Sequence, residues 1–329
     1  MSDTAPRPDL PATEGSSPID LGAMNASEIA AAMLRAEAAM PAAVEPELPA
    51  IAEAIDRVAQ RLATGGRLVL VGAGTSGRLA LIQSSEVGPT FGLGPGVVAA
   101  VVAGLGTSSD PRDPIATDDA AEDDAAAGAG AIVELGVGPA DAVVGIAASG
   151  RTLFTVAALE TAARRGALTV AVACAHPSPL AEAATIAIHP IIGPELLAGS
   201  TRLVAGSATK LVLDILTTGS MVRLGHVHRN RMVDVRATNA KLRDRAVRIV
   251  ADLTGRTDDE ARAALESVGW WARAAILRLE LGLDPAAARA RAAAHPFLAD
   301  ALAADAALGA LGDRTDRADR DAGPEPADG

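Results

Sequence analysis

Five short apolar segments alternate with longer segments of helical periodicity in the first two thirds of the chain. Continuous apolar runs of this length are typical of parallel strands that are buried on both faces. Strands that alternate with helices predict a doubly wound α/β sheet, in which ligands bind beyond the carboxyl ends of the strands. The five predicted strands span residues 67–71, 97–103, 142–147, 168–173 and 185–188.

Helical patterns precede and follow this predicted sheet. Apolar residues at 51, 55, 58 and 62 recur at helical spacing before the first strand. After Pro194 the pattern is helical over 201–224, 231–253, 258–281 and 284–308, and Trp270 and Trp271 are expected to fill the core of the last helices. We predict an N-terminal arm and helix at 1–47, an α/β domain at 48–250, a small helical domain at 251–312 and a disordered tail at 313–329.

Composition narrows the classes of partner. Of the 329 residues 49% are hydrophobic and 21% charged, as in globular proteins, but only 2% are aromatic and the net charge is -12. Few rings and an acidic surface argue against a nucleic-acid partner. No run of apolar residues is both long enough and free enough of charge to predict a membrane span. The first residues lack an apolar leader segment, and Cys174 is the single cysteine. These features predict a cytoplasmic protein with no membrane partner.

The first strand runs into the segment GAGTSG at residues 72–77, which matches the pattern G-x-G-x-x-G. In a strand-to-helix context this pattern is typical of dinucleotide sites, so an NAD-dependent oxidoreductase is one hypothesis. The second strand, however, ends in Gly104-Leu105-Gly106, where such enzymes need a ribose-binding acid. Hydroxyl residues Thr75 and Ser76 at a helix N-terminus suit a terminal phosphate equally well.

Two further loops have the same chemistry, at residues 148–152 (ASGRT) and 199–202 (GSTR). Ser149 and Thr152 could simply cap a helix. Three Ser/Thr/Gly loops at strand ends or helix starts can, however, surround a small phosphorylated ligand with neutral donors. We therefore favour a phosphate-bearing small molecule as the ligand.

Two acidic residues are candidates for acid–base chemistry. Glu86 lies at the end of the helix opened by the first loop, and Glu122 lies in the acidic run 118–124. Spacing alone selects neither, because exposed glutamates are usually solvated and acidic runs often begin helices. The five histidines have no metal-ligand spacing except the weak His226-x-His228, which is expected to be a solvated helix terminus. The residues alone therefore give no support for a metal site.

The chain resembles the N-acetylmuramic acid 6-phosphate etherases, which are built on the sugar isomerase (SIS) phosphosugar-binding domain. The likeness runs from about residue 13 to 308 and rests on GAGTSGRL, GIAASGRT, GPELLAGSTRL, ATKLVLDILTTG and NRMVDVRATNAKLRDRAVRIV. It implies an SIS-type fold over 48–250 and an enzyme that uses no metal or cofactor. The implied reaction removes D-lactate from N-acetylmuramic acid 6-phosphate and leaves N-acetylglucosamine 6-phosphate, in cell-wall recycling.

The resemblance also implies roles for particular residues. Glu86 becomes the acid on the lactate side and Glu122 the base at C2 of the opened sugar, a division less secure than the pair itself. Substrate-binding residues are then Gly74, Thr75, Ser76, Ser149, Gly150, Thr152 and Ser200.

Three further expectations follow. The chain departs from the family's pattern at Val204, where the family usually has lysine, and in the loop before Glu122. These departures leave a non-catalytic phosphosugar regulator of the glucokinase-regulatory type as the alternative. Residues 104–117 of that loop, rich in Gly, Ser, Asp and Pro, are expected to form a mobile cover over the pocket. A homodimer is expected, with an exposed apolar patch on the helix over 201–224 as its interface, formed by Leu211, Val212, Leu213, Ile215, Leu216, Met221 and Val222.

Overall fold

The structure is a computed structural model that describes residues 12–15, 17, 19–105 and 117–303. Contacts divide the chain into two compact units. Unit 1 comprises residues 1–89 and 93–223, and unit 2 comprises residues 90–92 and 224–329. The domain boundaries expected at 47, 250 and 312 stay a prediction, because compactness alone does not define a family domain. The expected tail and most of the expected cover loop lie outside the described residues.

Unit 1 is built on a five-stranded parallel sheet, as the apolar pattern predicts. Each predicted strand is present to within a residue or two, and adjacent strands pair in parallel in the order β2-β1-β3-β4-β5. The reversal of strand order between β1 and β3 is where ligands bind in such folds. The strands are β1 (Leu68–Gly72), β2 (Val98–Val102), β3 (Ala142–Ile146), β4 (Leu168–Val172) and β5 (Ile186–Ile188).

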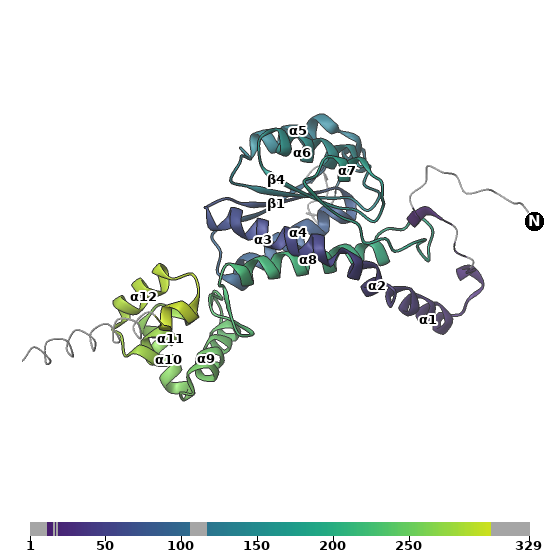
Figure 1. The fold of residues 1–329 in the computed structure, drawn as a ribbon. Helices are drawn as coiled ribbons and strands as arrows, with labels where there is room; N and C mark the ends of the chain where they lie inside the picture. Colours follow the sequence, from purple (N-terminus) through teal and green to yellow (C-terminus); the bar gives the residue numbers. More distant parts are fainter. Residues whose placement is uncertain (1–11, 16, 18, 106–116, 304–329) are drawn as a thin grey trace, which may run out of the picture. The chain divides into compact units, whose positions relative to one another are not determined.

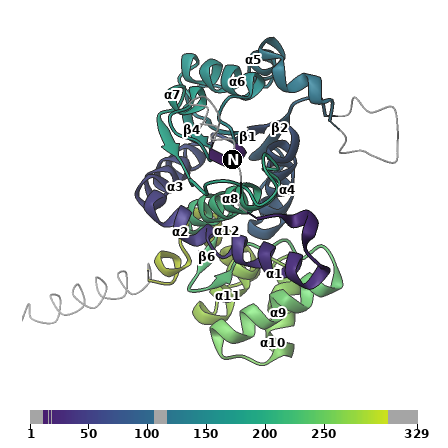
Figure 2. The ribbon, with the colours of Figure 1, turned by 90° about the vertical axis from the view of Figure 1, so that its right-hand side faces the viewer.

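Helices cover both faces of this sheet, which confirms the doubly wound fold (Figures 1 and 2). Alternate strand residues point to opposite faces and form two separate cores. One face packs against α3 (Leu48–Ala63), α4 (Gly74–Phe91) and α8 (Val204–Arg223). The other face packs against α5 (Ala125–Glu134), α6 (Leu153–Arg164) and α7 (Pro179–Glu182).

The expected interface patch on α8 is a wrong prediction. Val212, Leu213, Leu216 and Met221 are fully buried. Leu211 and Ile215 pack against the same core, so Val222 alone is well exposed, at 43%. The apolar residues of this helix are explained by its packing against one face of the sheet. They therefore give no evidence for a dimer.

Shorter elements of unit 1 precede the sheet, and one more lies between β2 and β3. The helix α1 begins at an Asn25 capping box, and Leu34 on it is 73% exposed. Among the described residues, no helix is both long and apolar enough to span a membrane. These elements are η1 (Ala12–Glu14), η2 (Leu21–Ala23), α1 (Ala26–Glu37), α2 (Met40–Val44), η3 (Glu45–Glu47) and η4 (Asp119–Asp123).

Unit 2 is helical around its own apolar core, apart from a short hairpin. The helix expected over 231–253 starts only at residue 240, because β6 and β7 pair around a turn in which Arg229 has a φ of +55°. The expected helix terminus at His226 and His228 is therefore wrong, because His226 directly precedes β6 and His228 belongs to it. Both tryptophans are half-buried at the edge of the core. The elements are β6 (Val227–His228), β7 (Arg231–Met232), α9 (Ala240–Thr254), α10 (Asp258–Ser267), α11 (Ala272–Leu281) and α12 (Pro285–Ala294).

Candidate functional site

The loop after β1 brings the start of α4 to the carboxyl edge of the sheet. Gly74 opens this helix with a φ of +51°, and a Cβ on it would lie 2.7 Å from Glu122 Oε1. A Cβ on Gly77 would meet Val102 Cγ1 at 2.5 Å. Glycine fits both positions without a shift, so α4 starts close to the strands, with the N–H groups of its first turn at the sheet edge.

A cavity of about 560 Å³ lies at this edge. It is lined from the loops after β1 and β3, from η1 and η4, and from the segment before α8, all within unit 1. This is the position that the reversed strand order between β1 and β3 predicts. Six of the predicted site residues line the cavity together: Gly74, Thr75, Ser76, Glu122, Ser149 and Thr152.

Six residues with side-chain hydroxyls contribute to the cavity wall. Thr201 and Thr209 add to the four predicted hydroxyls, while Arg78 is the one lysine or arginine among the described residues that line the cavity. The Arg78 guanidinium also donates to Thr117 Oγ1 at 3.2 Å. The carboxylates of Glu14, Glu122 and Asp123 also line the cavity, so a phosphate would depend on the neutral hydroxyls and on Arg78 for its hydrogen bonds.

The loop after β3 has separate roles for its three predicted residues. Ser149 Oγ accepts a hydrogen bond from the Arg151 N–H at 3.2 Å. Gly150 has a φ of +66°, and a Cβ on it would meet Ser178 Cβ at 2.4 Å. Thr152 is the N-cap residue of α6 but makes no capping bond with its side chain. The capping interpretation therefore fails for Thr152, and Gly150 shapes the loop without lining the cavity.

The acidic run before α5 combines capping with a cavity function. Asp118 accepts the Ala120 N–H at 3.0 Å, and Asp124 accepts the Ala127 N–H at 2.8 Å. Both aspartates therefore begin helical turns, as the simpler interpretation of the run predicts. Glu122 is half-buried and reaches into the cavity beside Gly74. A carboxylate is thus held next to the positive end of the α4 dipole.

Glu86, Gly150 and Ser200 are not among the residues that line the cavity. Glu86 is exposed near the far end of α4, twelve residues after Gly74. A helix rises about 1.5 Å per residue, so roughly 18 Å of helix separates Glu86 from the start of α4. Ser200 lies between two lining residues, Gly199 and Thr201. One copy of the chain does not bring the two predicted carboxylates together.

Two contributions to the cavity were missed by sequence reasoning. The arm before residue 20, expected to be loose, contributes Glu14 to the wall, and the Thr13 carbonyl accepts the N–H groups of Glu195 and Gly199. Glu195 is fully buried and accepts the N–H groups of Ala205 at 2.9 Å and Val204 at 3.2 Å. It thereby fastens the segment before α8. A capping carboxylate nine residues upstream falls outside local capping patterns.

Replacing Glu195 by glutamine is expected to raise KM several-fold and to lower the free energy of unfolding by about 1–3 kcal/mol, because one buried N–H loses its acceptor. Substrate titrations and urea unfolding of the purified variant measure both effects. Glu182→Gln, on an exposed residue of α7, is the matched control and should change neither quantity. A Glu195 variant as stable and as active as the wild type would contradict this role.

The titratable groups around the cavity include no reactive thiol. Burial raises the pKa of the Cys174 thiol to about 12, and its Sγ lies 3.8 Å from the Ala205 carbonyl. The thiol is therefore protonated at neutral pH and is a poor nucleophile. Within the part of the chain that the structure describes, no group of three or more His, Cys, Asp or Glu side chains could hold a metal ion.

Family models match three segments of the chain. Residues 50–163 match the glucokinase regulatory protein N-terminal SIS domain, and residues 133–218 match the SIS domain. Residues 229–269 match the C-terminal lid domain of glucokinase regulatory protein. The first two matches cover the sheet of unit 1 and every lining residue of its cavity except Glu14, and the third lies in unit 2.

Curated relatives match most of the chain under one name, "N-acetylmuramic acid 6-phosphate etherase". The relative from Rubrobacter xylanophilus is 50% identical over 285 residues, 86% of this chain and 93% of its own. The relative from Serratia proteamaculans is 45% identical and covers 87% and 93%. Among solved structures, the Vibrio vulnificus NanR protein complexed with ManNAc-6P aligns with a TM-score of 0.42 and 15% identity, over 61% of this chain and 64% of that one.

Proposed function

The chain belongs to the N-acetylmuramic acid 6-phosphate etherase family, and on that premise we propose the reaction and the residues that perform it. The substrate is N-acetylmuramic acid 6-phosphate, and the products are D-lactate and N-acetylglucosamine 6-phosphate. The observation that supports this best is the Glu122 carboxylate beside the start of α4, in a cavity walled by hydroxyls. A phosphorylated sugar offers a phosphate to those hydroxyls and an acidic C–H to that carboxylate.

Two proton transfers are needed for the ether to break. In the opened sugar the C1 aldehyde acidifies the C2 proton, which Glu122 removes as the C3–O bond breaks. An acid, which we assign to Glu86, protonates the lactate oxygen as it leaves. Water then adds to the unsaturated aldehyde: its oxygen bonds to C3 as a hydroxyl group, and a proton returns to C2. The net change is hydrolysis of the ether, which we propose to proceed by a carbon–oxygen lyase mechanism.

Glu86 needs a second copy of the chain to reach this cavity. Within one copy it lies near the opposite end of α4, so we propose a homodimer in which each copy supplies Glu86 to the cavity of its partner. Exposed apolar side chains on the N-terminal helices offer a surface for that contact: Met33 (41%), Leu34 (73%) and Leu48 (48%).

Mixing two inactive variants tests the shared site. Subunits of Glu86→Gln and Glu122→Gln, co-refolded in equal amounts, should regain about a quarter of wild-type activity, because about half of the dimers are mixed and each holds one intact site. Either variant alone is the control. No recovery, in mixtures shown by mass spectrometry to contain mixed dimers, would mean that both glutamates act within one copy.

The reaction itself is tested by incubating the purified protein with N-acetylmuramic acid 6-phosphate and measuring D-lactate with a stereospecific dehydrogenase. Stoichiometric lactate and N-acetylglucosamine 6-phosphate are expected. A non-catalytic phosphosugar regulator would instead bind the product and release no lactate. We further propose a cytoplasmic location, for which the single buried cysteine is modest support.

Replacing Ser149 by alanine is expected to act on affinity. A hydrogen bond to a charged phosphate contributes about 1.5–3 kcal/mol, so KM should rise roughly 10- to 100-fold while kcat changes little. Ser267→Ala is the matched control, because its hydroxyl bonds only to the Ala264 carbonyl of α10. An effect on kcat alone would remove Ser149 from the phosphate site.

A further inference from the structure

A second cavity, of about 530 Å³, lies entirely within unit 2. Its wall includes Trp270, Trp271 and Phe91. The whole chain has two tryptophans, three phenylalanines and no tyrosine. Three of its five large aromatic side chains therefore line one cavity. Cavities of this size with aromatic walls and a few polar groups are typical of small-molecule sites.

Trp270 is held in an unusual backbone conformation at this cavity. Its φ is +64°, directly after Gly269 at +73°, and a bulky residue rarely adopts such a value. The Arg243 guanidinium lies 4.9 Å from the centre of the Trp270 ring. Strain of this kind persists only where the surrounding structure imposes it, and it concentrates at binding sites.

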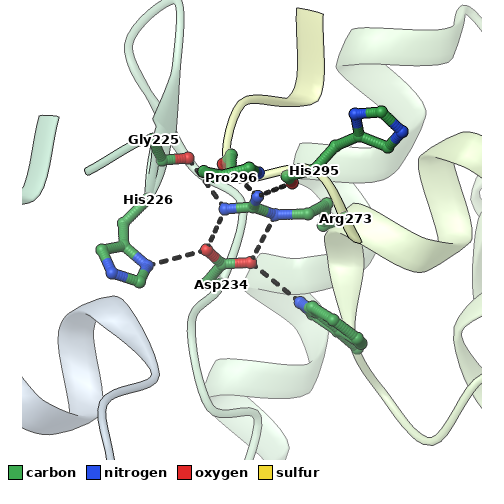
Figure 3. A network of polar contacts seen from close by, with 7 residues as sticks. Gly225, His226, Asp234, Arg273, His295 and Pro296 are labelled. Atoms are coloured by element: carbon green, nitrogen blue, oxygen red, sulfur yellow. Dashed lines mark hydrogen bonds and ion pairs between the residues drawn. The ribbon is translucent and has the colours of Figure 1, made fainter. Parts of the chain in front are cut away.

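A buried network fixes the wall behind the tryptophans (Figure 3). Asp234 Oδ1 accepts hydrogen bonds from Trp271 Nε1 at 2.8 Å and from Arg273 Nε at 2.9 Å, and His226 Nδ1 lies 2.8 Å from Oδ2. Burial opposes the charge on Asp234, but hydrogen bonds from His226 and Arg273 outweigh it and lower the pKa of this carboxyl. Its charge is therefore already neutralised by protein groups and not directed at a ligand.

The charges that remain free at this cavity are positive. Arg236 and Arg243 are exposed lining residues, and neither forms an ion pair with any residue that the structure describes. Asp234 is the one acid among the lining residues. In a protein of net charge -12, two guanidiniums at one cavity that form no ion pair with a described residue favour an anionic ligand.

We propose that this cavity of unit 2 binds a phosphorylated amino sugar, at a site separate from the cavity of unit 1. The two guanidiniums would hold the phosphate, and the aromatic rings would pack against the apolar face of the pyranose. The choice of sugar rests on the proposed function, because N-acetylglucosamine 6-phosphate is a product of that reaction. The anionic character of the ligand rests on the cavity alone.

Intrinsic fluorescence tests this site directly, because both tryptophans of the chain line it. Titration of the full-length protein with N-acetylglucosamine 6-phosphate should change the emission saturably. Arg236→Ala/Arg243→Ala should weaken this binding at least tenfold, as expected for loss of charged hydrogen bonds. Arg248→Ala, an exposed arginine of the same helix outside the cavity, is the matched control and should titrate as the wild type does.

A second variant separates the two cavities. Ser149→Ala/Thr152→Ala weakens the phosphate loops of unit 1 and should leave the fluorescence titration unchanged. A signal that is lost in this variant but kept in the arginine variant would overturn the proposal. So would an equal response to unphosphorylated N-acetylglucosamine, a tighter response to adenosine monophosphate, or no response at all. Lactate release is measured separately, so the proposed reaction and this site can each fail alone.

Discussion

Replacing Glu122 by glutamine is expected to lower kcat by roughly 10²- to 10⁴-fold, the usual contribution of a general base. Glutamine keeps the shape of the side chain beside the start of α4 but cannot accept the C2 proton. Binding depends on the hydroxyl loops, so KM should change little. The measurement is the rate of D-lactate release across a range of substrate concentrations, with circular dichroism to show that the fold is intact.

The neighbouring Asp123 provides a matched control. It lines the same cavity, so Asp123→Asn removes a nearby charge without removing the proposed base. A few-fold change at most is expected for that variant. If Glu122→Gln lost only a few-fold, or if Asp123→Asn lost as much as Glu122→Gln, the rate effect would reflect the general field of the cavity and Glu122 would not be the base.

The sheet could be predicted because its signal is local and redundant. Segments such as 142–147 are apolar throughout, and a strand buried on both faces requires that pattern. The same reasoning failed for α8. An apolar excess can be covered by the chain's own sheet or by a partner, and the sequence of a helix does not distinguish these two outcomes.

The cavity could be predicted only in part. Loops that follow β1 and β3 meet because parallel strands end at one edge, so topology leads us to expect Thr75 and Ser149 in one cavity, where both lie. Glu195 and Thr13 act through contacts between segments far apart in the sequence, which leave no periodic signal. Glu86 was paired with Glu122 by resemblance alone. Within one copy the two residues lie near opposite ends of α4.

Unit 2 was the least predictable part. The apolar pattern predicted a helix over 231–253, so it missed the hairpin and the extended segment that carries Asp234. The acidic side chain on that segment gathers partners from several elements, including Arg273 on α11 and His226 before β6. A buried charge of this kind is stabilised by long-range contacts, so neither composition nor spacing reveals it.

Replacing Asp234 by asparagine is expected to destabilise unit 2 by about 3–5 kcal/mol, because Arg273 is then left as a buried charge without its counter-ion. Arg273 is 4% exposed, and it also donates to the Gly225 and His295 carbonyls (Figure 3). Urea unfolding followed by tryptophan fluorescence measures the change, since both tryptophans lie in unit 2.

Asp252→Asn is the matched control, because Asp252 pairs with Arg231 at 2.7 Å on the surface of the same unit. Exposed pairs contribute less than about 1 kcal/mol, so this variant should unfold almost as the wild type does. A loss of stability in Asp234→Asn no larger than in Asp252→Asn would show that the network is not what holds unit 2 together.

The pH dependence of this difference gives an independent check. The pKa of Asp234 is lowered in the folded protein, so its charge stabilises the fold above the ordinary carboxyl pKa of about 4 and ceases to do so as the pH falls through the folded value. The wild type protonates Asp234 under those conditions and then resembles the asparagine variant. The stability difference between the two proteins should therefore be constant near neutral pH and shrink on acidification. A difference that persisted unchanged at low pH would mean that the asparagine acts through its shape, and that the ion pair with Arg273 is not the source of the stability.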